Sequence, residues 1–239
     1  MLKIHERYLN DFKIRDNSTT REEVLAGLFI DKFIAQNQTL IVGEYASKNL
    51  PDIVVADKSF GWEVMRCEHY IDFLHKNATE RLKEIDFDYN TYLKEKKDEN
   101  SIFYKVPLRI TVDNGKITST STGGHFHSID WMYGEYTVQL SKKLEKLNKG
   151  NYRNCEKCAL FVLSLSRALD KSSVDVFQKA LLTVSQYYEK LFCNVYLLTT
   201  SGIYEVKQSE IINTKLFKDD EYSIVINEMK NLLKIDQYL

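Results

Sequence analysis

The sequence has few of the residues that break regular structure or cross-link a chain. Its 239 residues include nine Gly, two Pro and four Cys. This composition gives no reason to expect long disordered or collagen-like segments. An excess of charge of one sign is lacking as well, because the sequence has 33 Lys and Arg residues and 34 Asp and Glu residues. A strongly basic protein that coats DNA is therefore not expected, although a local basic face is compatible with this balance.

Long hydrophobic runs are also missing. No apolar stretch approaches the ~20 residues that a helix needs to cross a bilayer, and residues 1–16 are charged throughout rather than signal-like. We therefore expect a cytoplasmic protein that has no membrane contact and keeps its cysteines reduced. Because 44% of the residues are hydrophobic, the chain can bury a sizeable core.

What the sequence does contain is a pair of β-rich runs around a Gly-containing turn. Asp52 precedes the first run, residues 53–55, and Glu63 lies inside the second run, residues 62–65. The pattern predicts a hairpin that brings these two carboxylates side by side. Two carboxylates in such a position can hold a hard cation such as Mg²⁺. A lone glutamate in a strand that should be buried is costly, which argues against a merely structural role.

The rest of the chain alternates between helical and β-rich patterns. Helices are expected at 24–36, 133–147, 173–191 and 222–233, strands at 40–45, 159–165, 193–199 and 203–206, and a hairpin at 102–122 around Asn114-Gly115. This order predicts an α/β protein with a mixed sheet flanked by helices. We treat residues 1–239 as a single domain, with a core at about 20–70 and 130–210 and a helical and hairpin elaboration at about 71–130.

Pro51-Asp52, ten intervening residues and Glu63-Val64-Met65 resemble the PD-(D/E)XK motif of the restriction-endonuclease-like nucleases. The resemblance implies a restriction-endonuclease-like mixed β-sheet core and hydrolysis of phosphodiester bonds in nucleic acid. DNA is favoured over RNA as the partner, but the choice between them stays open. It implies Asp52 and Glu63 as ligands of Mg²⁺ or Mn²⁺. Glu23 is a third candidate ligand, because the superfamily often has a glutamate on its first helix; helix capping or solvation is the alternative. A monomer and a homodimer are both open.

The lysine of that motif is missing, because position 65 is Met65. Arg66 is adjacent but would point to the opposite face of a strand. Within the superfamily the lysine can move to a neighbouring helix, and Lys143 is the substitute that the resemblance suggests. Gln139 and Lys143 are spaced to share one face of the predicted helix. The alternative is that Lys143 is a solvated surface lysine.

Two other functions remain open at this point. One is a catalytically inactive endonuclease fold that binds nucleic acid or protein. The other is a small zinc-binding protein built around Cys155 and Cys158, whose CxxC spacing can supply half of a zinc site. The remaining zinc ligands would then be His125 and His127, or the two other cysteines.

Overall fold

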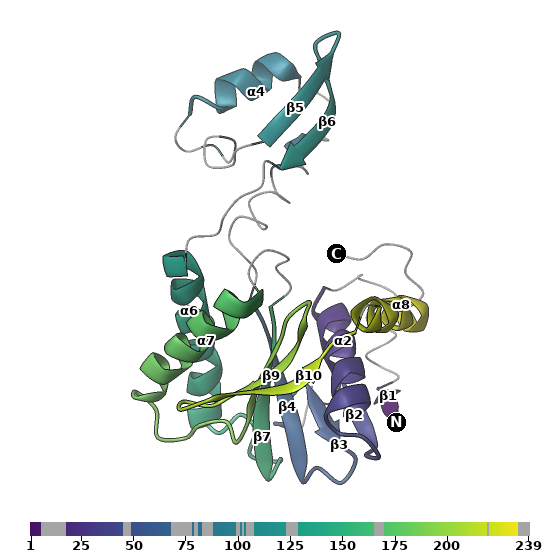
Figure 1. Ribbon diagram of the computed structural model, residues 1–239, viewed down its shortest axis with the longest axis vertical. Helices are drawn as coiled ribbons and strands as arrows, with labels where there is room; N and C mark the ends of the chain where they lie inside the picture. The colour runs from purple at the N-terminus through teal and green to yellow at the C-terminus, as the bar shows by residue number, and fades with distance from the viewer. Residues whose placement is uncertain are drawn as a thin grey trace. The chain divides into compact units, whose positions relative to one another are not determined.

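The fold is that of a computed structural model of the chain (Figure 1). It describes residues 1–5, 18–44, 49–67, 88–98, 108–122, 129–164, 170–218 and 220–233, together with residues 78, 81, 82, 101 and 103. The histidines proposed as zinc ligands, His125 and His127, lie outside the described residues. No helix in these ranges is long and apolar enough to cross a membrane.

The chain divides into two compact units, one formed by residues 1–67 and 132–239 and the other by residues 68–131. The second unit contains α4 (Tyr89–Glu95) and a two-stranded sheet of β5 (Leu108–Asp113) and β6 (Lys116–Thr122). The turn between these strands has positive φ at Asn114 (49°) and Gly115 (78°). That geometry is the reason for the strong Asn-Gly preference of tight hairpins, so the predicted hairpin is confirmed.

The first unit is built on an eight-stranded sheet with the order β1-β2-β3-β4-β7-β8-β9-β10. The strands are β1 (Leu2–Ile4), β2 (Leu40–Val42), β3 (Ile53–Val55), β4 (Phe60–Arg66), β7 (Lys157–Leu163), β8 (Val195–Leu198), β9 (Gly202–Val206) and β10 (Ile211–Leu216). β4, β7 and β8 run parallel, whereas β2–β3–β4 and β8–β9–β10 pair antiparallel. The sheet is therefore mixed, and the predicted α/β fold class is confirmed.

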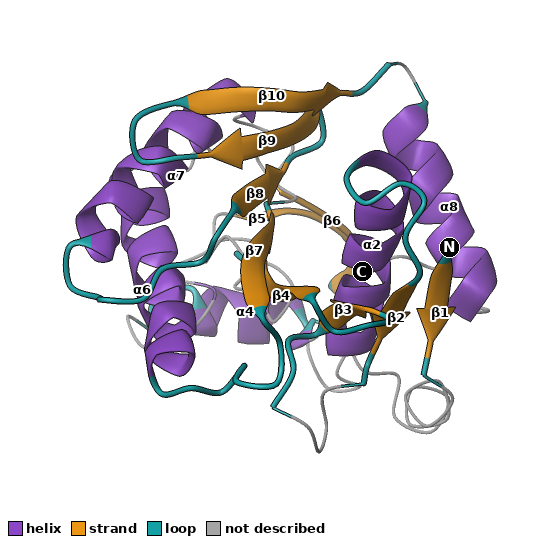
Figure 2. Cartoon of the chain, turned by 90° about the horizontal axis from the view of Figure 1, so that it is seen from below, coloured by secondary structure: helices purple, strands orange, loops and turns teal. Residues whose placement is uncertain are grey.

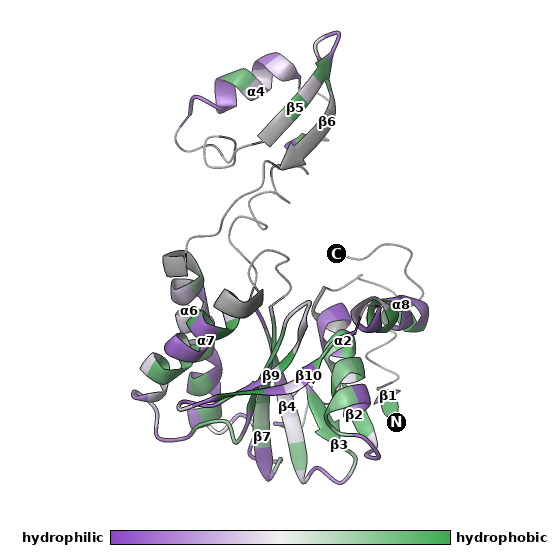
Figure 3. Ribbon diagram, viewed as in Figure 1, coloured by the Kyte–Doolittle hydropathy of each residue, from purple (hydrophilic) through white to green (hydrophobic). Residues whose placement is uncertain are grey.

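Helices cover both faces of this sheet. α6 (Ile129–Asn148) and α7 (Asp170–Ser185) lie on one side, and α2 (Ser18–Phe33) and α8 (Glu221–Leu233) lie on the other, as Figure 2 shows. In Figure 3, α8 carries both hydrophilic and hydrophobic residues, whereas β2 and β3 are mainly hydrophobic. This difference follows from position, because a helix at the surface buries one stripe and an inner strand is covered on both faces.

Alternation along β4 decides which helix each of its residues meets. Trp62 and Val64 belong to the apolar core that contains the buried residues of α2 and α8. Because successive side chains of a strand point to opposite faces, Glu63 and Met65 face the side of the sheet that α6 covers. This side is where the polar residues predicted from the sequence come together.

Candidate functional site

The predicted hairpin places Asp52 beside Glu63. Ile53 of β3 pairs with Trp62 of β4 in an antiparallel ladder. Asp52 precedes Ile53 and Glu63 follows Trp62, so these two residues come next to each other beyond the last pair. An oxygen of the Asp52 carboxylate, Oδ2, accepts a hydrogen bond of 2.8 Å from the backbone N–H of Val64. Glu63 is 3% exposed, which makes it one of the few buried charged residues in the described part of the chain.

Lys143 reaches this pair from α6. Its ammonium donates to Glu63 Oε1 and to the backbone carbonyl of Val64, each at 2.6 Å. A second cation, Lys146, has its Nζ 3.8 Å from the same Glu63 oxygen, and its side chain is 52% exposed. Because Lys143 and Lys146 are three residues apart, they share one face of the helix. The site therefore has a covered ammonium next to the carboxylates and an exposed ammonium at its rim.

Burial and neighbouring charge set the protonation of these groups. Burial first, and then the charge of Glu63, raise the pKa of Asp52 to about 7. Burial alone would lower the pKa of Lys143, but the charges of Glu63 and Asp52 outweigh it, so the pKa is raised above its usual range. Lys143 is therefore a fixed cation near neutral pH, and it is unsuited to accept a proton.

Glu23 and Gln139, the other two polar residues named from the sequence, differ in their relation to this centre. Glu23 is on α2 and is 3% exposed. Its charge is among those that raise the pKa of Lys143, so the two side chains lie in the same electrostatic environment. Gln139 donates to Glu135 at 2.9 Å, one turn before Lys143.

Arg66 is directed away from the site, as the strand alternation predicts. Its guanidinium forms an ion pair with Glu22 of α2, on the opposite side of the sheet from Lys143. Met65 is 1% exposed and thus belongs to the core. Of the two cations considered from the sequence, only Lys143 approaches Glu63.

One residue near the carboxylates was not predicted. Tyr152 lies in the turn between α6 and β7, and it is 7% exposed. Burial and then the charge of Glu63 raise its pKa. No motif spacing marks this tyrosine, because its proximity to Glu63 depends on how the turn folds back over the sheet.

The donors at this centre fit a hard divalent ion. They are the Asp52 and Glu63 carboxylates and the Val64 carbonyl, and the last two already hold one ammonium. All are oxygens, the ligands that Mg²⁺ and Mn²⁺ prefer. A cation between the carboxylates would also relieve the repulsion that helps to raise the pKa of Asp52. Within the described ranges, no group of three His, Cys, Asp or Glu side chains could hold an ion, so water would complete the coordination.

The cysteines of the CxxC pair are reduced and buried. Cys155 and Cys158 are free thiols, and their Sγ atoms contact backbone carbonyls, Lys157 O at 3.2 Å and Ala159 O at 3.6 Å. Burial raises the pKa of Cys155 to about 11 and also raises that of Cys158. Zinc binds the thiolate, so a zinc site here would have to overcome this preference for the protonated form.

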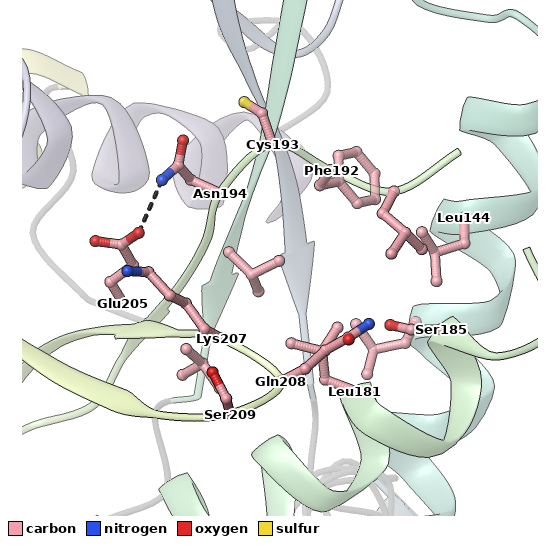
Figure 4. A pocket seen from close by; sticks show the side chains of 14 residues that line it. Leu144, Leu181, Ser185, Phe192, Cys193, Asn194, Glu205, Lys207, Gln208 and Ser209 are labelled. Carbon is pink, nitrogen blue, oxygen red and sulfur yellow. Dashed lines mark hydrogen bonds between the residues drawn. The ribbon is translucent and has the colours of Figure 1, made fainter. Parts of the chain in front are cut away.

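A separate cavity of about 380 Å³ lies between α6, α7 and the turn that joins β9 to β10 (Figure 4). Leu144, Leu181 and Phe192 contribute to its apolar lining, and Asn194 Nδ2 donates to Glu205 at its edge, at 2.8 Å. None of the residues predicted to hold Mg²⁺ or Mn²⁺ or to act in catalysis lines this cavity, although Cys193, one of the alternative zinc ligands, does. Its size suits a small molecule, but the paired carboxylates and the lysine lie elsewhere.

Comparison of the chain with protein-family models, with curated proteins and with solved structures found no match.

Proposed function

We propose that this protein is a divergent endonuclease-like enzyme that hydrolyses phosphodiester bonds in nucleic acid, DNA in preference to RNA, with Mg²⁺ or Mn²⁺. The observation that supports the proposal is the 2.6 Å contact of Lys143 with Glu63, directly beside Asp52. It gives the motif-like pair a lysine from another element, where the strand itself carries Met65. A cation, two carboxylates and a backbone carbonyl thus belong to one cluster that is linked through Val64.

Each residue has a distinct part in this chemistry. Asp52 and Glu63 would hold the divalent ion, with Glu23 close enough to add negative charge. When bound, the ion would activate water and neutralise charge on the phosphate oxygens. Lys143 keeps its proton, so it donates hydrogen bonds to the attacking water or to a phosphate oxygen. The exposed ammonium of Lys146 lies where the phosphate backbone of a substrate would approach.

The test is cleavage of plasmid DNA, single-stranded DNA and RNA with Mn²⁺ and with Mg²⁺. The wild type should cleave at least one of these substrates, and Glu63→Gln should not. Lys143→Met should lose roughly two orders of magnitude in rate, the usual effect of removing one charge-stabilising donor. Lys142→Met is the matched control, because Lys142 is adjacent but exposed. Equal losses in Lys142→Met and Lys143→Met would remove Lys143 from the proposed site.

The inactive binding module is the second candidate, and one observation favours it. Lys143 already neutralises Glu63 and occupies the Val64 carbonyl, which is the arrangement of a closed ion pair. A module of this kind would bind nucleic acid through Lys146 and its neighbours without cleaving it. Binding measured by fluorescence anisotropy, with no cleavage in either metal and no effect of Glu63→Gln, would favour this function over hydrolysis.

A further inference from the structure

Tyr152 has a buried hydroxyl without an evident role in the fold. The residue is 7% exposed, and its hydroxyl makes no hydrogen bond of ordinary geometry with any described residue. A buried donor without an acceptor costs free energy, so such groups are rare in folded proteins. The hydroxyl is nevertheless close enough to Glu63 and Asp52 for their charges to raise its pKa, after the larger effect of burial.

The turn that carries Tyr152 is fixed at several points. Asn154 N donates to Asn49 O at 3.3 Å, which ties the turn to the segment that leads into β3. Cys155 N donates to the carbonyl of Tyr152 at 3.0 Å. The tyrosine ring also lies against Phe192, with ring centroids 6.4 Å apart. The ring is therefore held in place, and its hydroxyl has little freedom to find an acceptor elsewhere.

Glu63 is the acceptor that this arrangement offers. Lys143 binds one oxygen of its carboxylate, Oε1, from α6, whereas Tyr152 approaches from the turn that follows the same helix. A phenol is protonated near neutral pH, so the hydroxyl can donate to the carboxylate. A bound ion would draw one oxygen of the Glu63 carboxylate toward itself, and the other oxygen would then be left for a neighbouring donor.

We propose that Tyr152 is a positioning residue for the metal centre. Its hydroxyl donates to the Glu63 carboxylate when a divalent ion is bound, and thereby fixes the orientation in which Glu63 offers an oxygen to the ion. This inference rests on the proposed function, because it requires that Asp52 and Glu63 bind a metal. Partners that orient a ligand in this way typically change metal affinity by about 10–100-fold.

The test compares Tyr152→Phe with the wild type in the full-length chain, using Mn²⁺ as the ligand. Isothermal titration calorimetry should show Mn²⁺ affinity weakened by about tenfold or more. Unfolding in EDTA should show no loss of stability, because the substitution keeps the ring and removes only an unsatisfied hydroxyl. Tyr188→Phe is the control: Tyr188 OH donates to a different acceptor, Ser141 O of α6, at 3.2 Å, so Mn²⁺ affinity should stay unchanged.

The outcomes separate this inference from the proposed function. If the wild type and Tyr152→Phe bind Mn²⁺ equally well, Tyr152 is not a positioning residue, and the metal centre stands without it. If Tyr152→Phe is clearly less stable in EDTA, the hydroxyl serves the fold, and the inference is also wrong. If the wild type binds no Mn²⁺, the proposed metal centre is wrong, and the positioning role of Tyr152 is wrong as well.

Discussion

Asp52 and Lys143 bind the two polar backbone groups of one residue, Val64. The Asp52 carboxylate accepts from its N–H at 2.8 Å, and the Lys143 ammonium donates to its carbonyl at 2.6 Å. The β3–β4 ladder pairs only Ile53 with Trp62 and Val54 with Gly61, so it ends before it reaches Val64. Buried backbone groups need partners. The proposed catalytic side chains therefore also complete the edge of β4 where its neighbouring strand stops.

This double role predicts different effects for two substitutions of Asp52. Asp52→Asn keeps an oxygen that can accept from the Val64 N–H, whereas Asp52→Ala leaves that N–H unsatisfied. We expect Asp52→Ala to lower the free energy of unfolding by about 1–3 kcal/mol relative to Asp52→Asn. Both variants should lose the stabilisation that the wild type gains from Mg²⁺. Thermal melts with and without Mg²⁺ check both statements, and equal apo stabilities would show that the Val64 contact is unimportant.

The raised pKa of Asp52 predicts a specific dependence of stability on pH. Its value of about 7 in the folded protein exceeds the ordinary 3.8, so the folded state binds this proton more tightly than the unfolded state does. Without metal, the contribution of Asp52 to stability is therefore present at low pH and is lost as pH rises from about 4 to about 7. Asp52→Asn should flatten this slope in urea unfolding measured in EDTA.

A control for the pH experiment is available in the same hairpin. Asp57 is exposed, and hydrogen bonds from Ser59 lower its pKa. Asp57→Asn should therefore leave the loss of stability between about pH 4 and about pH 7 in place. A wild-type slope that survives in Asp52→Asn would assign the effect to another group.

Moving the lysine from the helix to the strand tests whether its position or its charge matters. Lys143→Met leaves the buried Glu63 with only the exposed ammonium of Lys146 nearby, and it should destabilise the apo protein by about 3 kcal/mol, as when one partner of a buried pair is removed. Met65→Lys alone adds an ammonium at a position that is 1% exposed, so it should also destabilise. In the double variant the two changes compensate, because position 65 lies on the same face of β4 as Glu63.

The double variant should thus be more stable than the sum of the two single effects indicates. It should also recover part of the cleavage rate that Lys143→Met loses. A double-mutant cycle from chemical unfolding measures the coupling directly. Additive effects on stability and rate would mean that residue 65 cannot replace Lys143.

Gly61 predicts a steric sensitivity next to the site. A Cβ at this position would lie 2.4 Å from Pro51 Cγ and 2.9 Å from the Ile53 carbonyl. Gly61→Ala should therefore cost about 1–3 kcal/mol of stability, and it should weaken Mn²⁺ binding because Pro51 adjoins Asp52. Gly134→Ala in α6 is the control, because a Cβ there would meet no atom of the described residues within 4 Å. A helical alanine in place of this glycine should stabilise by about 1 kcal/mol, and calorimetric melts of both variants provide the comparison.

The zinc hypothesis has its own measurement. If Cys155 and Cys158 are packing residues, the purified protein should contain no stoichiometric zinc by elemental analysis. Cys158→Ala should then affect stability only through packing. One zinc per chain that is lost in Cys155→Ser would instead support the zinc-binding alternative.

The sequence predicted the parts of the fold that depend on local patterns. The Asn114-Gly115 turn needed positive φ, and the β3–β4 hairpin followed from two β-rich runs around Gly61. The exposed edge strand β10 was missed because Ile211–Leu216 has no strong alternation of buried and exposed positions. The helix predicted at 24–36 begins earlier in the structure, at Ser18, and ends at Phe33.

For the candidate site too, the sequence predicted the residues that are close in the chain better than those that are distant. Asp52 and Glu63 could be paired from the sequence because one short turn joins their strands. Lys143 is 80 residues away from Glu63, so only the resemblance to a superfamily in which this lysine can migrate suggested it. Tyr152 carried no signal, because an irregular turn determines where its hydroxyl lies.

In the sequence, the second unit (residues 68–131) separates Asp52 and Glu63 from Lys143. In the course of synthesis, Glu63 is therefore made well before Lys143, and a partly made chain has the acidic pair without its ammonium. The entropy of closing this interval grows only with the logarithm of its length, about 0.6 kcal/mol for each doubling. Insertions or deletions in residues 68–131 thus cost little at the point where Lys143 meets Glu63. The length and sequence of residues 68–131 can therefore change while Glu63 and Lys143 keep their contact.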